Sequence, residues 1–285
     1  MPPLLEDIES QWEESHLQIA GFKTVDFTAE RGFVLSFWGG SNMNNKLAEM
    51  RSRLIVALDV SDRNDALKLV EQLSPEVGAF KVGMQLYNST GPAIVKDIQD
   101  AGGNVFIDLK FHDIPNTVGQ AARVMSRKGA FMYTVHAGGG SKMLQAAADS
   151  AAEEAKYFAA PRPLSLAVTV LTSLSQEELS QELAINRSVA EHVVALAKMA
   201  KASGIDGVVC SPQELDMVRA ACGDDFLIVT PGVRPRWAAV NDQKRIMTPK
   251  EAIARGASYI VVGRPILKAE SPVEAARKIV TEMAE

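Results

Sequence analysis

The sequence has only two cysteines, Cys210 and Cys222, and no apolar run of the roughly 18 residues needed to span a bilayer. Two cysteines without metal-ligand spacing are too few for a disulfide framework, so we expect reduced thiols. The net charge of −5 over 285 residues gives no reason to expect binding to nucleic acid or an anionic membrane. The first residues, MPPLLEDIES, lack the basic segment and apolar core of a secretory signal. We therefore expect a soluble, cytoplasmic protein that binds neither nucleic acid nor membrane.

Residues 1–50 differ in composition from the rest of the chain. They hold eight acidic and three basic residues, an excess equal to the net charge of the whole protein. Residues 4–19 could form a short amphipathic helix, and the apolar segment 32–38 precedes the loop-like sequence GGSNMNN. We predict an N-terminal extension over 1–50. It is either a docking arm for a partner or, as we favour, a poorly ordered segment or an early start, with Met43 or Met50 in place of Met1.

From residue 51 onward, apolar runs alternate with segments of helical periodicity. The runs are continuous, which is typical of parallel strands buried on both faces. They cover residues 54–59, 79–83, 104–110, 131–137, 164–171, 207–210, 226–232 and 259–263. Capping residues or an early proline favour helix starts at Ser61–Asp62, Asp113–Pro115, Ser141, Ser211–Pro212 and Thr248–Pro249. Eight strand–helix units over 51–285 predict one α/β domain, a (β/α)8 TIM barrel. An open, doubly wound sheet fits less well, because no G-x-G-x-x-G follows the first run.

The stretch VFIDLKFHDIPNT, residues 105–117, places three charged residues close to the end of the third run. Asp108 and Lys110 are two positions apart, so an extended strand points them to the same face, and Asp113 could return from the following turn. Bringing two carboxylates to one ammonium is costly, because like charges oppose each other's ionisation. In isolation the pattern is more typical of a solvated ion pair, which contributes little to stability. The position of this cluster in the fold distinguishes a functional site from an ordinary ion pair.

The barrel prediction requires functional side chains to gather where the strands end. Polar or glycine residues stand at or just beyond the ends of several runs, and Lys81 lies within the second. These residues are Asp59, Lys81, Asp108, Lys110, Thr172, Arg234, Gly263 and Arg264. We therefore predict a polar pocket with a carboxylate–ammonium floor from runs one to three and an arginine-bearing rim from runs seven and eight.

The rim is typical of a phosphate site. In these barrels phosphate is often held by the loops after strands seven and eight. Gly263 permits close approach of the backbone, and Arg264 supplies a planar fork of donors. Arg234 opens the segment 232–248, whose length and composition favour a lid that orders over an anion. The alternative for Arg264 is a structural salt bridge.

Seven segments together carry a specific resemblance: VALDV, AFKVG, DLKFHDIPNT, TVLTS, TPGVRP, NDQKR and VVGRPI. In this order and spacing the chain resembles the orotidine 5′-phosphate decarboxylase family, of the shorter bacterial type, from about Leu54 to its C-terminus. The resemblance implies loss of CO2 from orotidine 5′-monophosphate to give UMP, the last step of de novo pyrimidine synthesis. It implies no metal and no other cofactor.

The resemblance also implies roles for the predicted floor. Asp108 would lie against the substrate carboxylate and disfavour the ground state, while Lys110 would stabilise the developing carbanion and then protonate it. Lys81 and Asp59 would bind ribose hydroxyls and order the charges.

Further roles concern the partner subunit and the phosphate. The equivalents of Asp113 and Thr117 reach the neighbouring subunit's site in this family, which implies a homodimer. Thr172 would contact the pyrimidine. The phosphate would be held by Arg234, Gln243, Gly263 and Arg264.

Two alternatives stay open. One is a metal-dependent phosphosugar decarboxylase or aldolase on the same barrel, against which the sequence over 114–117 and the loop with Gln243 argue. The other is a non-catalytic phosphate-binding barrel recruited through the extension. The complete set of Asp108, Lys110 and Asp113 argues against that one.

Overall fold

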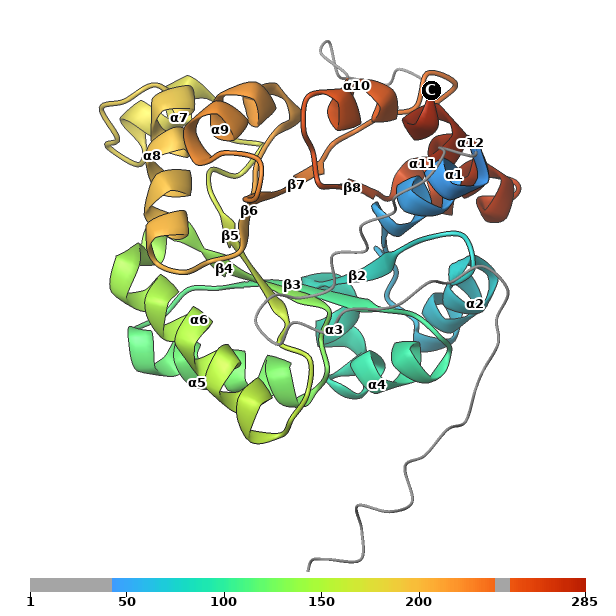
Figure 1. Ribbon diagram of the computed structural model, residues 1–285, viewed down its shortest axis with the longest axis horizontal. Helices are drawn as coiled ribbons and strands as arrows, with labels where there is room; N and C mark the ends of the chain where they lie inside the picture. The colour runs from blue at the N-terminus through green and yellow to red at the C-terminus, as the bar shows by residue number, and fades with distance from the viewer. Residues whose placement is uncertain (1–42, 239–246) are drawn as a thin grey trace, which may run out of the picture. The chain divides into compact units, whose positions relative to one another are not determined.

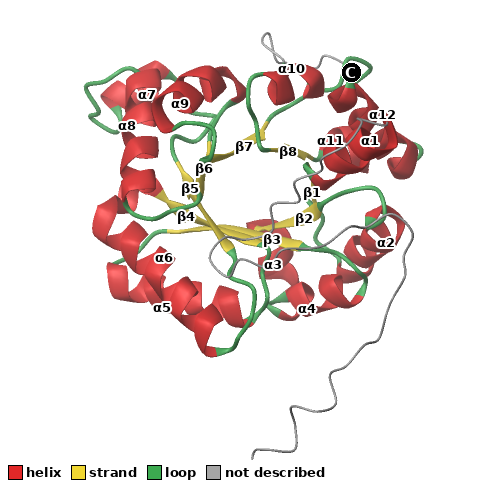
Figure 2. Cartoon of the chain, viewed as in Figure 1, coloured by secondary structure: helices red, strands yellow, loops and turns green. Residues whose placement is uncertain are grey.

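The computed structural model describes residues 43–238 and 247–285, and within them eight parallel strands close into a barrel in chain order (Figure 2). This confirms the predicted (β/α)8 barrel. The predicted helix over 4–19, the segment 32–38 and Gln243 lie outside the described residues. The strands are β1 (Leu54–Ala57), β2 (Ala79–Gly83), β3 (Val105–Phe111), β4 (Met132–His136), β5 (Leu164–Val168), β6 (Gly207–Val209), β7 (Leu227–Pro231) and β8 (Tyr259–Val262).

Helices surround the strands on the outside (Figure 1). They are α1 (Met43–Ser52), α2 (Arg63–Leu73), α3 (Met84–Thr90), α4 (Ala93–Asp100), α5 (Pro115–Arg127), α6 (Gly140–Tyr157), α7 (Gln176–Gln181), α8 (Val189–Ala202), α9 (Leu215–Cys222), α10 (Pro249–Ala254), α11 (Arg264–Leu267) and α12 (Pro272–Ala284). Short 3-10 turns at Ala137–Gly139 and Pro212–Glu214 precede α6 and α9. None of the described helices is long and apolar enough to cross a membrane.

The strands are buried on both faces, as their continuous apolar sequence predicts. A cluster that includes Ile55, Phe106 and Met132 contains no helical residue and therefore fills the inside of the barrel. The larger cluster joins the other strand face, for example Val56 and Ile107, to the helices. Successive side chains of a strand alternate between these two apolar environments, which explains why the runs show no polar alternation.

Most of the predicted helix starts are observed. The Asp62 carboxylate accepts the N–H groups of the first turn of α2, Thr248 caps α10 in a capping box, and Pro115 is the first residue of α5. The start of α6 differs slightly. This helix begins at Gly140 directly after a 3-10 turn, so Ser141 lies in its first turn and does not cap it.

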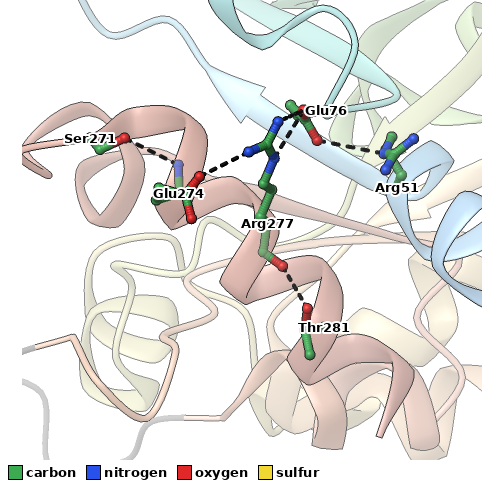
Figure 3. Close-up of polar contacts among 6 residues, drawn as sticks. All are labelled: Arg51, Glu76, Ser271, Glu274, Arg277 and Thr281. Atoms are coloured by element: carbon green, nitrogen blue, oxygen red, sulfur yellow. Dashed lines mark hydrogen bonds and ion pairs between the residues drawn. The ribbon is translucent and has the colours of Figure 1, made fainter.

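The C-terminal helix α12 is fixed to the start of the barrel by a buried carboxylate (Figure 3). Glu76, which is 9% exposed, accepts hydrogen bonds from Nε and Nη2 of Arg277 at 3.1 and 2.7 Å. Nε of Arg51, in α1, lies 3.8 Å from the other oxygen of Glu76. Residues 43–50, the end of the predicted extension, thus belong to a helix that packs on α12, with Met50 only 4% exposed.

Candidate active site

Four charged side chains, from β2, β3 and the segment just after β1, meet at the C-terminal mouth of the barrel. Nζ of Lys81 lies 3.6 Å from Oδ1 of Asp59 and 3.5 Å from Oδ2 of Asp108. Nζ of Lys110 donates to Oδ1 of Asp108 at 2.8 Å. Asp108 therefore stands between two ammonium groups, and the charges alternate along the row. The structure brings together the four residues of the predicted floor.

The order of strands in the barrel creates this cluster. β1 pairs with β2 and β2 with β3, and Gly83 is in register with Asp108. A Cβ atom at Gly83 would lie 3.1 Å from Nζ of Lys81, so glycine leaves room for that ammonium. On the other side of β1, a Cβ atom at Gly263 would lie 3.4 Å from Oδ2 of Asp59. The floor thus borders directly on the end of β8.

The backbone of β3 is distorted where it carries Lys110. The register between β3 and β4 shifts between Ile107 and Phe111, and Lys110 has a φ of 53°, in the left-handed region. A side chain in that region costs about 1–2 kcal/mol, and such strain persists where surrounding contacts hold it. One such contact is Thr134 of β4, whose Oγ1 accepts the N–H of Lys110 at 2.8 Å.

Thr134 is a site residue that the sequence analysis did not identify. Its hydroxyl donates to Oδ1 of Asp108 at 3.0 Å, so it links the backbone of Lys110 to the carboxylate that holds the Lys110 ammonium. Thr134 is fully buried. The available signal was a hydroxyl within the apolar run 131–137, where Thr134 follows Tyr133, and such a hydroxyl needs a partner when it is buried.

Two histidines, also absent from the sequence analysis, flank the cluster. The rings of His112 and His136 stack with centroids 5.0 Å apart. Nδ1 of His136 accepts the N–H of Gly138 at 3.0 Å. Burial lowers the pKa of His136, and His112 and Lys110 lower it further. A neutral His136 fits its role as a hydrogen-bond acceptor.

Asp113 and Thr117 lie apart from the floor of their own chain. Both are exposed: Asp113 lies just before α5, and Thr117 lies in the first turn of that helix. Oδ1 of Asp113 accepts the N–H of Ile114 at 2.6 Å, and Asp113 forms no ion pair with any residue that the structure describes. Ile114, between them, is 65% exposed. This segment carries polar groups and an apolar side chain outward.

The two arginines of the predicted rim, Arg234 and Arg264, follow the neighbouring strands β7 and β8. Arg264 is exposed and Arg234 is partly buried. Burial lowers the pKa of Arg234, and the charge of Arg264 lowers it further. An anion such as phosphate would offset the repulsion between two guanidinium groups at this position. Thr172 lies exposed in the turn after β5, and Gln243 lies outside the described residues.

Over residues 43–238 and 247–285, no three His, Cys, Asp or Glu side chains gather in a way that could hold a metal ion. The charged groups that the described residues place at the mouth are ammonium groups, carboxylates and guanidinium groups.

Comparison with known proteins gives consistent matches over the barrel. The family model described as "Orotidine 5'-phosphate decarboxylase / HUMPS family" matches residues 52–279. An orotidine 5'-phosphate decarboxylase of Syntrophomonas wolfei is 56% identical over 238 residues, 83% of this chain and 100% of the relative. One from Heliobacterium modesticaldum is 56% identical over 237 residues, 83% of this chain and 98% of the relative.

Solved structures agree with these relatives. The crystal structure of orotidine 5'-phosphate decarboxylase from Lactobacillus acidophilus superimposes with a TM-score of 0.72 and 42% sequence identity. The match covers 81% of this chain and 98% of that chain.

Proposed function

Because the chain belongs to the orotidine 5′-phosphate decarboxylase / HUMPS family, we propose that it converts orotidine 5′-monophosphate to UMP and CO2, the last step of de novo pyrimidine synthesis. The observation that carries the proposal is the alternating row of Asp59, Lys81, Asp108 and Lys110 at the barrel mouth. The matches to the two relatives with this name span 100% and 98% of the relatives' own length.

In this reaction the bond between a pyrimidine ring carbon and the carboxyl group breaks, and its electron pair stays on the ring carbon. We assign Lys110 to stabilise that developing charge as a fixed cation and then to give it a proton, while CO2 leaves. Asp108 would face the substrate carboxylate and disfavour the ground state. Because Asp108 holds the Lys110 ammonium at 2.8 Å, the cation would be in place before the charge develops. No metal or cofactor is part of this proposal.

The substrate phosphate would lie at the rim. Arg234 and Arg264 supply two guanidinium groups there, and Gly263 lets the backbone approach closely. Lys81 and Asp59, at the side of the floor that borders the rim, would bind the ribose hydroxyls. The contact of Thr172 with the pyrimidine and that of Gln243 with the phosphate stay predictions. Binding energy from the phosphate, remote from the reacting carbon, would help to assemble the site.

We further propose that the active form is a homodimer in which Asp113 and Thr117 complete the partner's site. The support is their exposure, their separation from the floor of their own chain and the exposed Ile114 between them. In a dimer, the segment from Lys110 to Thr117 would serve two sites, with its first residue in one and its last in the other.

The test of the proposed activity is the fall in ultraviolet absorbance when the purified chain acts on orotidine 5′-monophosphate, with and without EDTA. Turnover that EDTA leaves unchanged is expected. No turnover would refute the proposal, and turnover abolished by EDTA and restored by Mg²⁺ would favour a metal-dependent enzyme on the same barrel.

The shared site has its own test. Asp113→Ala and Lys110→Ala proteins, each nearly inactive alone, should regain activity when mixed, since a hybrid dimer holds one site that lacks neither residue. No recovery, despite subunit exchange demonstrated with a tagged subunit, would show that Asp113 does not act in trans.

A further inference from the structure

Side chains at the C-terminal end of helix α12 contact Arg236 and Trp237, at the start of the loop that follows β7. Arg236 lies 3.8 Å from Glu282 and 3.8 Å from Glu285, measured from Nε and Nη1 respectively. Nζ of Lys278 lies 5.9 Å from the ring centroid of Trp237, within cation–π range. Positions 278 and 282 of α12 are four residues apart, and Glu285, the residue directly after the helix, follows three positions later, so the three side chains lie on one side. Arg236 and Trp237 therefore lie along this side of the helix.

Glu282 is an unusual residue for such a contact, because it is only 6% exposed. Its Oε1 accepts no hydrogen bond from the residues that the structure describes, and Nε of Arg236 at 3.8 Å is its charged neighbour. Burial raises the pKa of Glu282, the Arg236 backbone and guanidinium lower it, and Glu285 and Glu251 raise it. A buried carboxylate with so few hydrogen bonds adds little to stability, and an apolar residue would suit the position as well.

The link from this contact to the rim is short and stiff. Between Arg236 and Arg234 stands only Pro235, which is buried and whose ring fixes its own φ and restricts the residue before it to extended conformations. The N–H of Ala238 donates to the carbonyl of Pro235 at 3.0 Å, which closes a turn. The N–H of Arg234 donates to the carbonyl of Met247 at 3.0 Å. A shift of Arg236 would therefore move Arg234.

Arg234 needs such an anchor. The charge of Arg264 lowers the pKa of Arg234, so the two guanidinium groups repel each other when no anion lies between them. If nothing held Arg234 in place, the two guanidinium groups would move apart in the absence of phosphate. Phosphate binding would then have to bring them together again. A rim that is already in place avoids this cost in affinity.

We propose that Glu282 is a positioning residue for phosphate recognition: through Arg236 and Pro235 it holds Arg234 beside Arg264. The inference rests on the proposed function, in which these two arginines bind the substrate phosphate. Glu282 itself touches no substrate. Its effect should therefore appear only in ligands that carry the phosphate.

The experiment replaces Glu282 by glutamine, which keeps the shape and removes the charge. We expect Glu282→Gln to raise KM for orotidine 5′-monophosphate about two- to fivefold, with kcat at saturation unchanged, as an ion pair of this kind allows. By calorimetry, the affinity for UMP should fall by the same factor, and the affinity for uridine, which lacks the phosphate, should not change. The melting temperature should stay constant or rise.

Arg236→Gln provides the second arm. The Arg236 side chain is 60% exposed, but its loss leaves the buried Glu282 carboxylate without its charged neighbour, so the melting temperature of this variant is measured as well. The variant should reproduce the effect of Glu282→Gln, and the double variant should be no worse than either single one. Glu274→Gln is the matched control, since it removes an exposed, ion-paired carboxylate from the same helix without touching the loop. It should leave KM and UMP affinity unchanged.

Arg234→Ala tests separately whether Arg234 binds the phosphate at all, which the positioning role of Glu282 requires. If it weakens UMP binding while Glu282→Gln and Arg236→Gln do not, the positioning role is refuted and the phosphate site stands. If Arg234→Ala leaves UMP affinity unchanged, the assignment of the rim itself is refuted. A loss of kcat and uridine affinity in Glu282→Gln would also overturn the proposal, because it would indicate a general structural defect.

Discussion

Replacing Lys110 by alanine should separate the chemical role of its ammonium from its contribution to folding. The ammonium donates to Asp108 at 2.8 Å, with the two side chains 28% and 14% exposed. A hydrogen bond to a charged group in such a place contributes about 1–2 kcal/mol. Asp108 keeps Lys81 at 3.5 Å and the Thr134 hydroxyl at 3.0 Å, so it is not left unpaired. We expect the free energy of unfolding to fall by about 1–2 kcal/mol, which a folded domain tolerates.

The loss of turnover should be far larger. Proton transfer by a positioned group contributes roughly 10²–10⁴-fold, and a fixed charge aimed at the transition state roughly 10²–10³-fold. Lys110 is proposed to supply both effects. We therefore expect Lys110→Ala to lower kcat by about 10⁴- to 10⁷-fold, an energy several times greater than its effect on stability.

Glycine at the same position is an internal control for the backbone. Lys110 has a φ of 53°, which alanine tolerates poorly and glycine adopts freely. Lys110→Gly should therefore be more stable than Lys110→Ala by about 1 kcal/mol. The two variants should lose turnover equally, because neither carries an ammonium group.

The assay follows the ultraviolet absorbance of orotidine 5′-monophosphate, and urea unfolding gives the stability of each variant. Lys68→Ala, which removes an exposed lysine of α2, is the control and should match the unsubstituted protein in both measurements. Turnover of Lys110→Ala within tenfold of the unsubstituted protein would refute the role assigned to Lys110. A glycine variant that recovers turnover would instead assign the defect to the backbone.

Four further outcomes are expected. Arg264→Ala should raise KM at least about tenfold with little change in melting temperature, because the side chain is exposed. Thr134→Val should lower both kcat and, by about 1–2 kcal/mol in a urea titration, stability, since it leaves the N–H of Lys110 without its partner and removes one of the hydrogen bonds to Asp108. Deleting 1–42 should leave turnover unchanged, whereas deleting 1–52 removes the buried Met50 and should cost about 2–4 kcal/mol of unfolding free energy. Glu76→Gln should cost about 1–2 kcal/mol at pH 7. That difference should fade on acidification, because the Arg277 hydrogen bond keeps the pKa of Glu76 below its usual range, and its stabilisation is lost once the carboxyl is protonated.

The strands were predictable because burial on both faces leaves a clear pattern in the sequence. Seven of the eight predicted strands end within two residues of the observed ones, while the fifth apolar run, 164–171, outlasts β5, which ends at Val168. Val170 is buried as well, so its apolar character reflects burial and not strand geometry. A continuous apolar run does not distinguish a strand from the buried turn that follows it.

The polar floor was predictable for a similar reason. Parallel strands all end at one mouth, so residues at the ends of runs one to three have to meet there. Thr134 and the two stacked histidines were not predictable as partners, because a hydroxyl or an imidazole within an apolar run does not show which neighbour it will bond. The anchoring of Arg236 by Glu282 joins residues on separate elements, and no local pattern links them.

By itself, the sequence determined the succession of eight strands, the charged residues at their ends and the resemblance that assigns them a chemistry. These features are local, since they depend on the periodicity and order of residues along the chain. Only the tertiary structure decided how the charges are shared. Asp108 lies between two ammonium groups, Lys110 adopts a left-handed backbone conformation at a bulge, and the Asp113 carboxylate accepts the N–H of Ile114. The physical reason is that the energy of a charge depends on its distance to other charges, and closure of the barrel sets those distances.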